Sequence, residues 1–215
     1  MFTDLNIPGM LLGYVCLLFA LSVHEAAHGA ISNRCGDPSA RLLGRVSLNP
    51  LAHIDPIGTV VMPLLMMVSG YPFLFGWAKP VPFNPRNLRN MRRDPVFIAL
   101  AGPIANLLLA TLFVFASRFV TTLFHEGLQS NVPILLAAFL QGMIAINLVL
   151  AAFNLIPVPP LDGHHVLYYF MPESGQRALE QIGPFGILIA IMVARPLFKH
   201  LYPLFERVFE FAGFA

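Results

Sequence analysis

Three long stretches of the chain contain no charged residue, and they restrict the fold more than any other feature. The stretches cover residues 56–78, 95–117 and 127–161. Each is longer than the roughly 20 residues that a helix needs to cross a bilayer. Only 11% of the 215 residues are charged and 57% are hydrophobic, whereas about 25% of a soluble domain is charged. The sequence therefore predicts an all-α polytopic membrane protein.

About four to six membrane-embedded helices are expected, within a single domain that spans residues 1–215 and has its core at roughly 8–170. The apolar helices that are expected to cross the membrane lie at about 8–33, 95–120 and 132–155, and a further apolar helix is expected at the C-terminus, at about 184–212. Glycine and proline interrupt residues 55–77, which favours a re-entrant segment buried against protein. Residues 40–49 are too few for a span, and they are expected to form a small β-hairpin or an extended segment.

Basic residues set the expected orientation. Three arginines lie in loop 33–54, and one lysine and four arginines lie in loop 79–93. The positive-inside bias places both loops on the cytoplasmic side, which requires residues 55–77 to enter and leave the same face. The net charge of +2 is small and the arginines form no stripe, so no nucleic acid partner is expected.

Two histidines and a glutamate interrupt the first apolar helix, in the sequence His24-Glu25-Ala26-Ala27-His28. Histidines four residues apart project from one face of a helix, about one turn from each other. In that arrangement two imidazoles can hold one zinc ion, and the glutamate can take a proton from a water molecule at the metal. The alternative is a histidine pair that hydrogen-bonds to the backbone or caps a helix end. Ionisable groups inside a membrane are costly without a function, which favours the metal site.

A catalytic zinc ion has three protein ligands and an open position for water, so a third ligand is needed. Asp162 is the leading candidate because it alone interrupts a long charge-free stretch, at the end of FNLIPVPPLDG. Three prolines loosen the backbone before it, and Gly163 permits close packing against another helix. The alternative is an aspartate that caps a helix at the membrane surface.

The two motifs together resemble those of the site-2 proteases, a family of intramembrane zinc metalloproteases. The resemblance is closer to the compact bacterial and archaeal members, which lack a PDZ-like or nucleotide-sensing CBS domain. Members combine an HExxH helix with an Asn-x-x-Pro-x-x-x-Leu-Asp-Gly segment on a later helix, which here runs from Asn154 to Gly163. The sequence AGPIANLLLA, residues 101–110, is also similar to the family's small-residue helix between the motifs. The similarity covers roughly residues 8–170.

This resemblance implies a zinc-dependent metalloendopeptidase with one zinc ion per chain. His24, His28 and Asp162 would bind the zinc, Glu25 would act as the catalytic base, and Asn154 would hold or polarise the substrate. The expected reaction is hydrolysis of peptide bonds within or near the transmembrane segments of membrane protein substrates, in regulated intramembrane proteolysis. The expected surroundings are the lipid bilayer of a prokaryotic cell membrane.

The active site is expected nearer the cytoplasmic side. His24 lies about nine residues before the loop that follows the first helix, which at about 1.5 Å per residue places the zinc roughly 12 Å from that helix end. His53 and His164 are further candidates, for positions beside the metal ligands. His53 could equally lie in a turn, and His164 in a polar pair at the membrane surface.

A different class of function is a non-hydrolytic membrane protein that binds or transports metal with the same ligands. It predicts that Glu25→Gln retains function, whereas a protease would lose cleavage and keep its zinc. A di-iron desaturase or hydroxylase is a weaker alternative, because such sites generally need more histidines than the seven in this chain.

Overall fold

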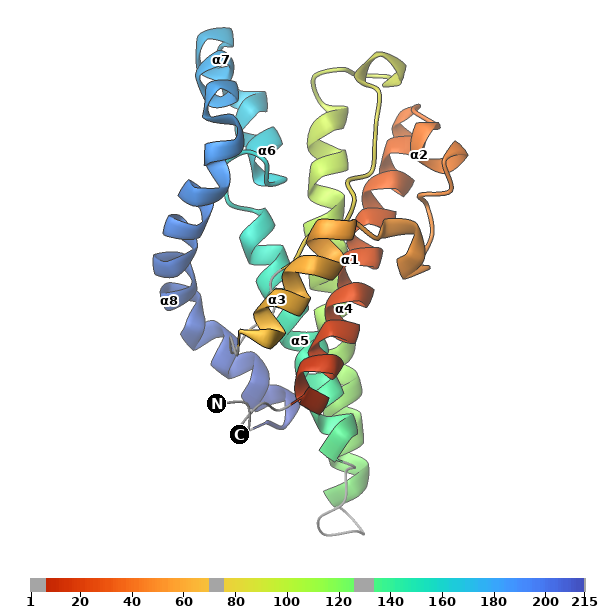
Figure 1. The fold of residues 1–215 in the computed structure, drawn as a ribbon, viewed down its shortest axis with the longest axis vertical. Helices are drawn as coiled ribbons and strands as arrows, with labels where there is room; N and C mark the ends of the chain where they lie inside the picture. The colour runs from red at the N-terminus through yellow and green to blue at the C-terminus, as the bar shows by residue number, and fades with distance from the viewer. Residues whose placement is uncertain (1–6, 70–75, 126–133, 215) are drawn as a thin grey trace.

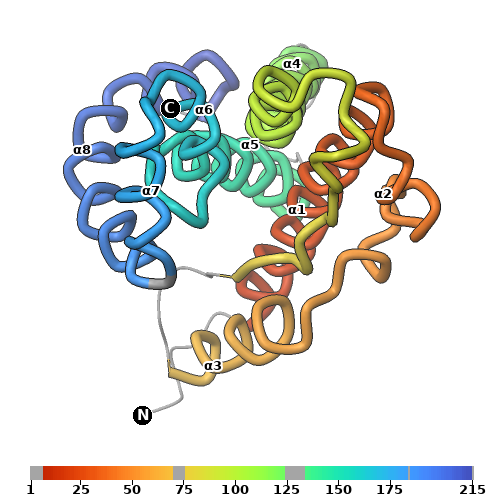
Figure 2. The backbone as a smooth tube through the Cα atoms, turned by 90° about the horizontal axis from the view of Figure 1, so that it is seen from above, coloured from red at the N-terminus to blue at the C-terminus, as the bar shows by residue number. Residues whose placement is uncertain are grey.

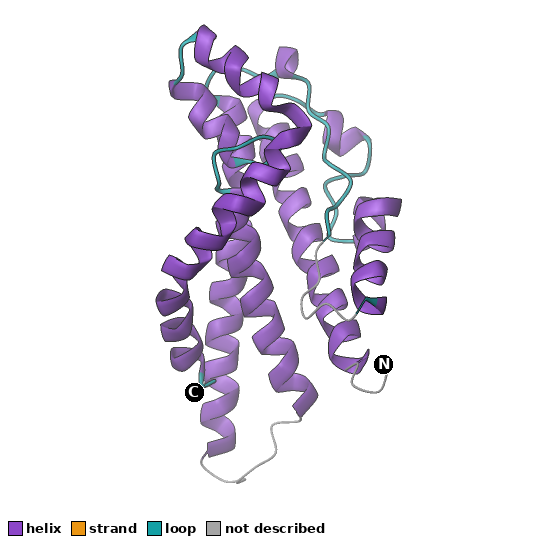
Figure 3. Cartoon of the chain, turned by 60° about the vertical axis from the view of Figure 1, so that its left-hand side comes forward, coloured by secondary structure: helices purple, strands orange, loops and turns teal. Residues whose placement is uncertain are grey.

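A computed structural model describes residues 7–69, 76–125 and 134–214 of the chain. Within these ranges the regular elements are helices and no β-strand is formed, which confirms the all-α prediction (Figure 3). The helices long and apolar enough to cross a membrane are α1 (Ile7–Cys35), α4 (Asp94–His125), α5 (Ile134–Asn154) and α8 (Gly186–Ala212).

The long helices alternate in direction. In Figure 1, α1 runs upward, α4 returns downward, α5 rises again and α8 descends. Seen from above, α5 lies near the centre, with α1, α4 and α8 around it (Figure 2). Met143 and Ile144 of α5 are fully buried, whereas Leu112 and Phe119 of α4 are exposed. Helices that are apolar on every side suit a bundle whose outer face meets lipid.

One buried carboxylate joins the loops at the upper end of the bundle in Figure 1. Asp37 is fully buried and follows α1, just before the short helix α2 (Ser39–Leu42). Its carboxylate accepts hydrogen bonds from the Ser39 hydroxyl at 2.6 Å, the Asn84 N–H at 2.7 Å and the Asn87 amide at 2.9 Å. Loops 33–54 and 79–93 therefore meet at the same end of the bundle, as the distribution of basic residues predicts.

The described parts of segment 55–77, residues 55–69 and 76–77, lie side by side, as the predicted re-entrant segment requires. The π-helix η2 (Pro56–Val61) and α3 (Met62–Val68) descend beside α1, and an extended chain from residue 76 returns upward to α4 (Figure 1). The returning chain pairs with the descending one, because the Trp77 N–H donates to the Gly58 carbonyl at 3.2 Å. The Trp77 ring lies directly over Gly58, where any side chain would collide with it. Residues 70–75 lie outside the described residues.

The predicted β-hairpin at residues 40–49 is wrong. The segment begins with α2, continues through a turn at Gly44 with φ of +68°, and leads to the 3-10 helix η1 (Pro50–His53). Two side chains explain the difference. Asp37 accepts the Ser39 N–H at 3.2 Å, which starts a helical turn. Arg45 turns inward, and its guanidinium donates to the carbonyls of Ala52, Lys79 and Pro80, which holds the segment against other loops instead of a partner strand.

The link between α5 and the following helices is irregular. Residues 155–162 form turns and bends, and then come α6 (Gly163–Phe170), α7 (Glu173–Ile182), the short η4 (Gly183–Phe185) and α8. Asp162 therefore precedes a helix and does not lie within one, because the prolines at 157, 159 and 160 cannot continue α5. Gly163 packs against the Leu155 and Ile156 carbonyls, so the link folds back on the end of α5.

Candidate metal centre

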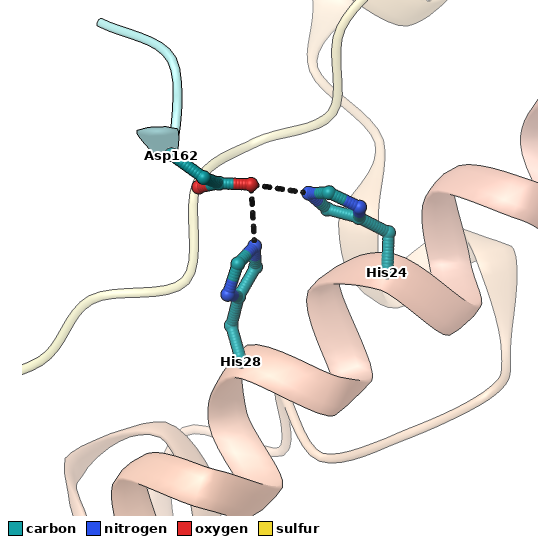
Figure 4. Close-up of side chains that lie close together, drawn as sticks. All are labelled: His24, His28 and Asp162. Atoms are coloured by element: carbon teal, nitrogen blue, oxygen red, sulfur yellow. Dashed lines mark ion pairs between the residues drawn. The ribbon is translucent and has the colours of Figure 1, made fainter. Parts of the chain in front are cut away.

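Helix α1 presents His24 and His28 to the link after α5. The two histidines are one helical turn apart and are 4% and 8% exposed. Their Nε2 atoms lie 3.1 Å and 3.4 Å from Oδ2 of Asp162 (Figure 4). The three possible ligand atoms all lie within 4.8 Å of one another. The structure thus brings together the three residues predicted as metal ligands, from distant parts of the sequence.

Each histidine is oriented through its other ring nitrogen. His28 Nδ1 lies 2.7 Å from the Ile98 carbonyl oxygen, and His24 Nδ1 lies 2.6 Å from Oδ1 of Asn106. A carbonyl oxygen only accepts hydrogen bonds, so each Nδ1 carries the proton and donates. In the neutral rings, Nε2 then has a free lone pair directed at Asp162. This is the tautomer in which histidine binds a metal through Nε2.

The three groups converge without a proton donor. Oδ2 of Asp162 is buried and receives no hydrogen bond from any described residue. Two nitrogen lone pairs and one carboxylate oxygen that converge in a buried site could hold a cation between them. Two imidazoles and one carboxylate fit zinc, with a fourth position left for water.

Helix α4 reaches the candidate ligands because residue 102 is glycine. A Cβ atom at Gly102 would stand 2.6 Å from Nε2 of His24 and would also collide with Nε2 of His28. Only a residue without a side chain allows α4 this close approach. The segment AGPIANLLLA, predicted to pack closely, therefore forms one wall of the site.

Glu25 lies beside the histidines on α1 and is half-buried. Its Oε2 accepts a hydrogen bond of 3.0 Å from the Val81 N–H. Val81 belongs to the extended chain that returns from the re-entrant segment, and this chain passes along α1, where Val81 also approaches Gly29. The returning chain thus fixes the Glu25 carboxylate on the helix that also carries His24 and His28.

Three other predicted residues lie outside this cluster. Asn154 ends α5 and donates to the Leu150 carbonyl of its own helix at 3.0 Å. Nε2 of His53 lies 2.8 Å from the Ser47 carbonyl oxygen, and Nδ1 of His164 lies 2.6 Å from the Leu161 carbonyl oxygen. No hydrogen bond or ion pair joins any of the three to the candidate ligands within the described ranges. Their suggested roles stay predictions.

Two buried asparagines were missed by the sequence reasoning. Asn106 was considered only as a small residue for close packing, and Asn147 was not singled out. Both side chains are fully buried between the long helices. The available signal was the cost of an amide inside a membrane helix, which usually marks a polar partner nearby.

Comparisons with known proteins point in one direction. The sequence profile of Peptidase family M50 matches residues 126–194. YwhC of Bacillus subtilis (strain 168), named as a candidate zinc metalloprotease, is 34% identical over 200 residues, which cover 88% of this chain and 84% of YwhC. Two proteins named Rip2, also candidate zinc metalloproteases, are 29% and 30% identical over 198 residues, which cover 91% of this chain and 72% of each relative. They come from Mycolicibacterium smegmatis and Mycobacterium tuberculosis. No solved structure is significantly similar to the chain.

Proposed function

Because this chain belongs to peptidase family M50, the site-2 protease family, and is a multi-pass membrane metalloprotease, we propose that it cleaves peptide bonds within or near the transmembrane segments of membrane proteins. The observation that carries this proposal is the convergence of His24, His28 and Asp162. The two histidines lie on one membrane helix, α1, together with Glu25. Regulated intramembrane proteolysis is the process in which we expect it to act.

We infer that one zinc ion per chain is held by Nε2 of His24, Nε2 of His28 and Oδ2 of Asp162. The buried Oδ2 atom without a donor supports this assignment. When bound, zinc makes a water molecule acidic and polarises the scissile carbonyl. The burial of both histidines keeps competing water from the ligand atoms, and their Nδ1–H bonds keep the lone pairs aimed at one point.

Glu25 is the proposed general base. It follows His24 directly on α1, and the Val81 N–H holds Oε2 in place. Oε1 can then take a proton from the attacking water and later deliver it to the leaving amine. A glutamate held by the backbone loses little freedom in each cycle, because its orientation is set before the substrate arrives.

Three further residues are assigned supporting roles. Asn154 would hold the substrate through its amide after releasing the Leu150 carbonyl. His164 supports the backbone at Leu161, next to the ligand Asp162. The His53 carbonyl accepts the Lys79 N–H at 2.9 Å and so anchors the chain that carries Val81.

A substrate helix must unwind, because helical carbonyls are hidden in hydrogen bonds. An apolar groove beside α1 offers room for an extended segment, and it is lined by Val23, Ala26, Ala27, Ala30, Val46, Ser47 and Leu48. Within the described residues, the backbone groups of Val46 and Leu48 make no hydrogen bond. An unwound substrate could therefore pair with them as an added strand, with its apolar side chains against α1.

The proposed location is a prokaryotic cell membrane, with the active site nearer the cytoplasmic side. The basic loops at the upper end of the bundle in Figure 1 support this orientation under the positive-inside bias. The 215 residues would act as a single membrane-embedded protease domain.

Cleavage by a Glu25→Gln variant separates this proposal from a metal-binding or transport protein. The purified chain would be reconstituted in vesicles with single-span membrane proteins, and cleavage would be followed by electrophoresis and mass spectrometry. We expect Glu25→Gln to lower the rate by about 10²- to 10⁴-fold, as for loss of a general base, while zinc stays bound. Glu173→Gln, at an exposed position of α7, is the matched control and should cleave normally. Wild-type rates from Glu25→Gln would contradict the proposal.

A further inference from the structure

A row of buried amides leads from the centre of the bundle to one candidate zinc ligand. Oδ1 of Asn106 on α4 lies 2.6 Å from Nδ1 of His24 on α1. Nδ2 of Asn106 donates to Oδ1 of Asn147 on α5 at 2.7 Å, and also to the Ala20 carbonyl at 3.3 Å. Asn147 in turn donates to the Met143 carbonyl at 2.8 Å. The row therefore connects α1, α4 and α5 at the level of His24.

Backbone carbonyls fix the direction of every bond in this row. Asn147 must point its Nδ2 at the Met143 carbonyl, because a carbonyl cannot donate. Its Oδ1 is then left to accept from Asn106. Asn106 likewise points its Nδ2 at the Ala20 carbonyl, which leaves Oδ1 for His24. His24 can meet that oxygen only as the Nδ1–H donor, so its Nε2 carries the lone pair.

Packing alone does not explain Asn106 and Asn147, because an apolar side chain could fill each buried position. Both are fully buried, and an unpaired amide in such a place would be costly. Both protons of the Asn106 amide and its oxygen have partners, and two of these belong to α1, at Ala20 and one turn later at His24. Asn106 thus makes two hydrogen bonds to α1, one with the Ala20 carbonyl and one with the His24 ring. His28 has no such row, because its Nδ1–H donates directly to a backbone carbonyl, that of Ile98.

We propose that Asn106 and Asn147 are positioning residues for the metal centre, which set the tautomer and the ring orientation of His24. Asn106 acts on His24 directly, and Asn147 acts through Asn106 by preventing its amide from turning over. This inference rests on the zinc site of the proposed function. It goes beyond that function by assigning a positioning role to two residues that contact neither metal nor substrate. It also predicts that zinc affinity depends on how α5 packs against α4.

Zinc affinity of the purified chain, measured by competition with a chelator, tests the proposal. We expect Asn106→Ala and Asn147→Leu each to weaken zinc binding by about 10- to 100-fold, as for other groups that orient a metal-bound histidine. The double variant should be no weaker than Asn106→Ala, because Asn147 acts only through Asn106. Asn147→Leu leaves the Asn106 side chain in the protein and removes only the bond that holds its amide in orientation, so it remains informative if Asn106→Ala fails to fold.

Ser117→Ala is the matched control. Ser117 is a fully buried residue of α4, and its hydroxyl donates to the Ala212 carbonyl of α8 at 2.8 Å, away from the metal centre. It should lower the melting temperature of the zinc-free protein without changing zinc affinity. Wild-type affinity in both asparagine variants, an equal loss in Ser117→Ala, or losses that multiply in the double variant would overturn the proposal. A wild-type protein that binds no zinc would instead overturn the proposed function and, with it, this inference.

Discussion

At the residue scale, Asp37 shows how a charged group is kept inside this protein. The carboxylate is fully buried, and burial alone would raise its pKa. Hydrogen bonds from Ser39, Asn87 and Asn84 outweigh burial and lower the pKa of Asp37 from 3.8 to about 2. The charged form is therefore the one that the folded loops stabilise. The stabilisation is fully present above pH 3.8 and is lost as the pH falls through about 2.

Replacement of Asp37 should consequently have a pH-dependent effect on stability. We expect Asp37→Asn to lower the free energy of unfolding by about 1 to 3 kcal/mol at neutral pH, because several hydrogen bonds to a charged group are lost. The difference from wild type should shrink as the pH falls from 4 towards 2, where the wild-type carboxylate takes up a proton. Thermal unfolding in detergent across this range measures it. A difference that is the same at pH 7 and pH 2 would refute this explanation.

Single residues of the site could be predicted when their spacing or their surroundings were unusual. His24 and His28 stood out by their helical spacing, and Asp162 by its charge in an apolar stretch, and the structure places all three together. Asn106 and Asn147 carry no charge and follow no metal-binding pattern. Their role depends on three helices meeting at one level, which a linear sequence does not display.

At the scale of elements, one face of α4 packs against the candidate metal centre. Ile98, Gly102 and Asn106 are four residues apart and therefore lie on one side of the helix. The Ile98 carbonyl accepts a hydrogen bond from His28, and Asn106 accepts one from His24. Gly102 lets the α4 backbone come close to both histidine rings. A helix with a larger residue at 102 could not make all three contacts.

Gly102→Ala should therefore disturb the site more than a similar change elsewhere. The new methyl group would collide with the ring nitrogens of both histidines, so α1 and α4 must move apart. We expect a loss of about 1 to 3 kcal/mol in stability and a marked fall in zinc affinity. Gly142→Ala on α5 is the control, since its methyl group would stand 3.3 Å from the Cys16 sulfur, away from the metal. Equal zinc affinity in the two variants, measured by chelator competition, would show that the close approach is unimportant.

The long helices were predictable because lipid imposes a length and an apolar composition on them. The expected spans at 8–33 and 132–155 differ by only a few residues from α1 and α5. The short segment 40–49 obeys no such rule. Its helix and turn depend on Asp37 and on the inward turn of Arg45, which its length and mixed composition do not reveal, so the expected hairpin or extended segment does not form.

At the scale of the whole molecule, the candidate metal centre lies where distant parts of the chain pack against one another. The link that carries Asp162 is held by a cluster of Ile156 and Leu161 with Ala190 and Ala194 of α8. Gly186, at the start of α8, packs directly against the Pro159 carbonyl. The C-terminal helix thus supports Asp162, a candidate ligand that lies outside that helix. From residues alone, Asp162 was only a candidate, and its meeting with α1 was implied by the family resemblance, because local sequence patterns do not specify long-range contacts.

The zinc content of the purified chain tests the central claim most directly. The protein would be purified in detergent without chelators and measured by elemental analysis, together with Asp162→Ala and, as a control, Asp37→Asn. We predict about one zinc ion per chain in the wild type and in Asp37→Asn, and less than about a tenth of that in Asp162→Ala, because a catalytic zinc depends on all three protein ligands. A wild-type chain without zinc, or an Asp162→Ala variant with the full amount, would contradict the account.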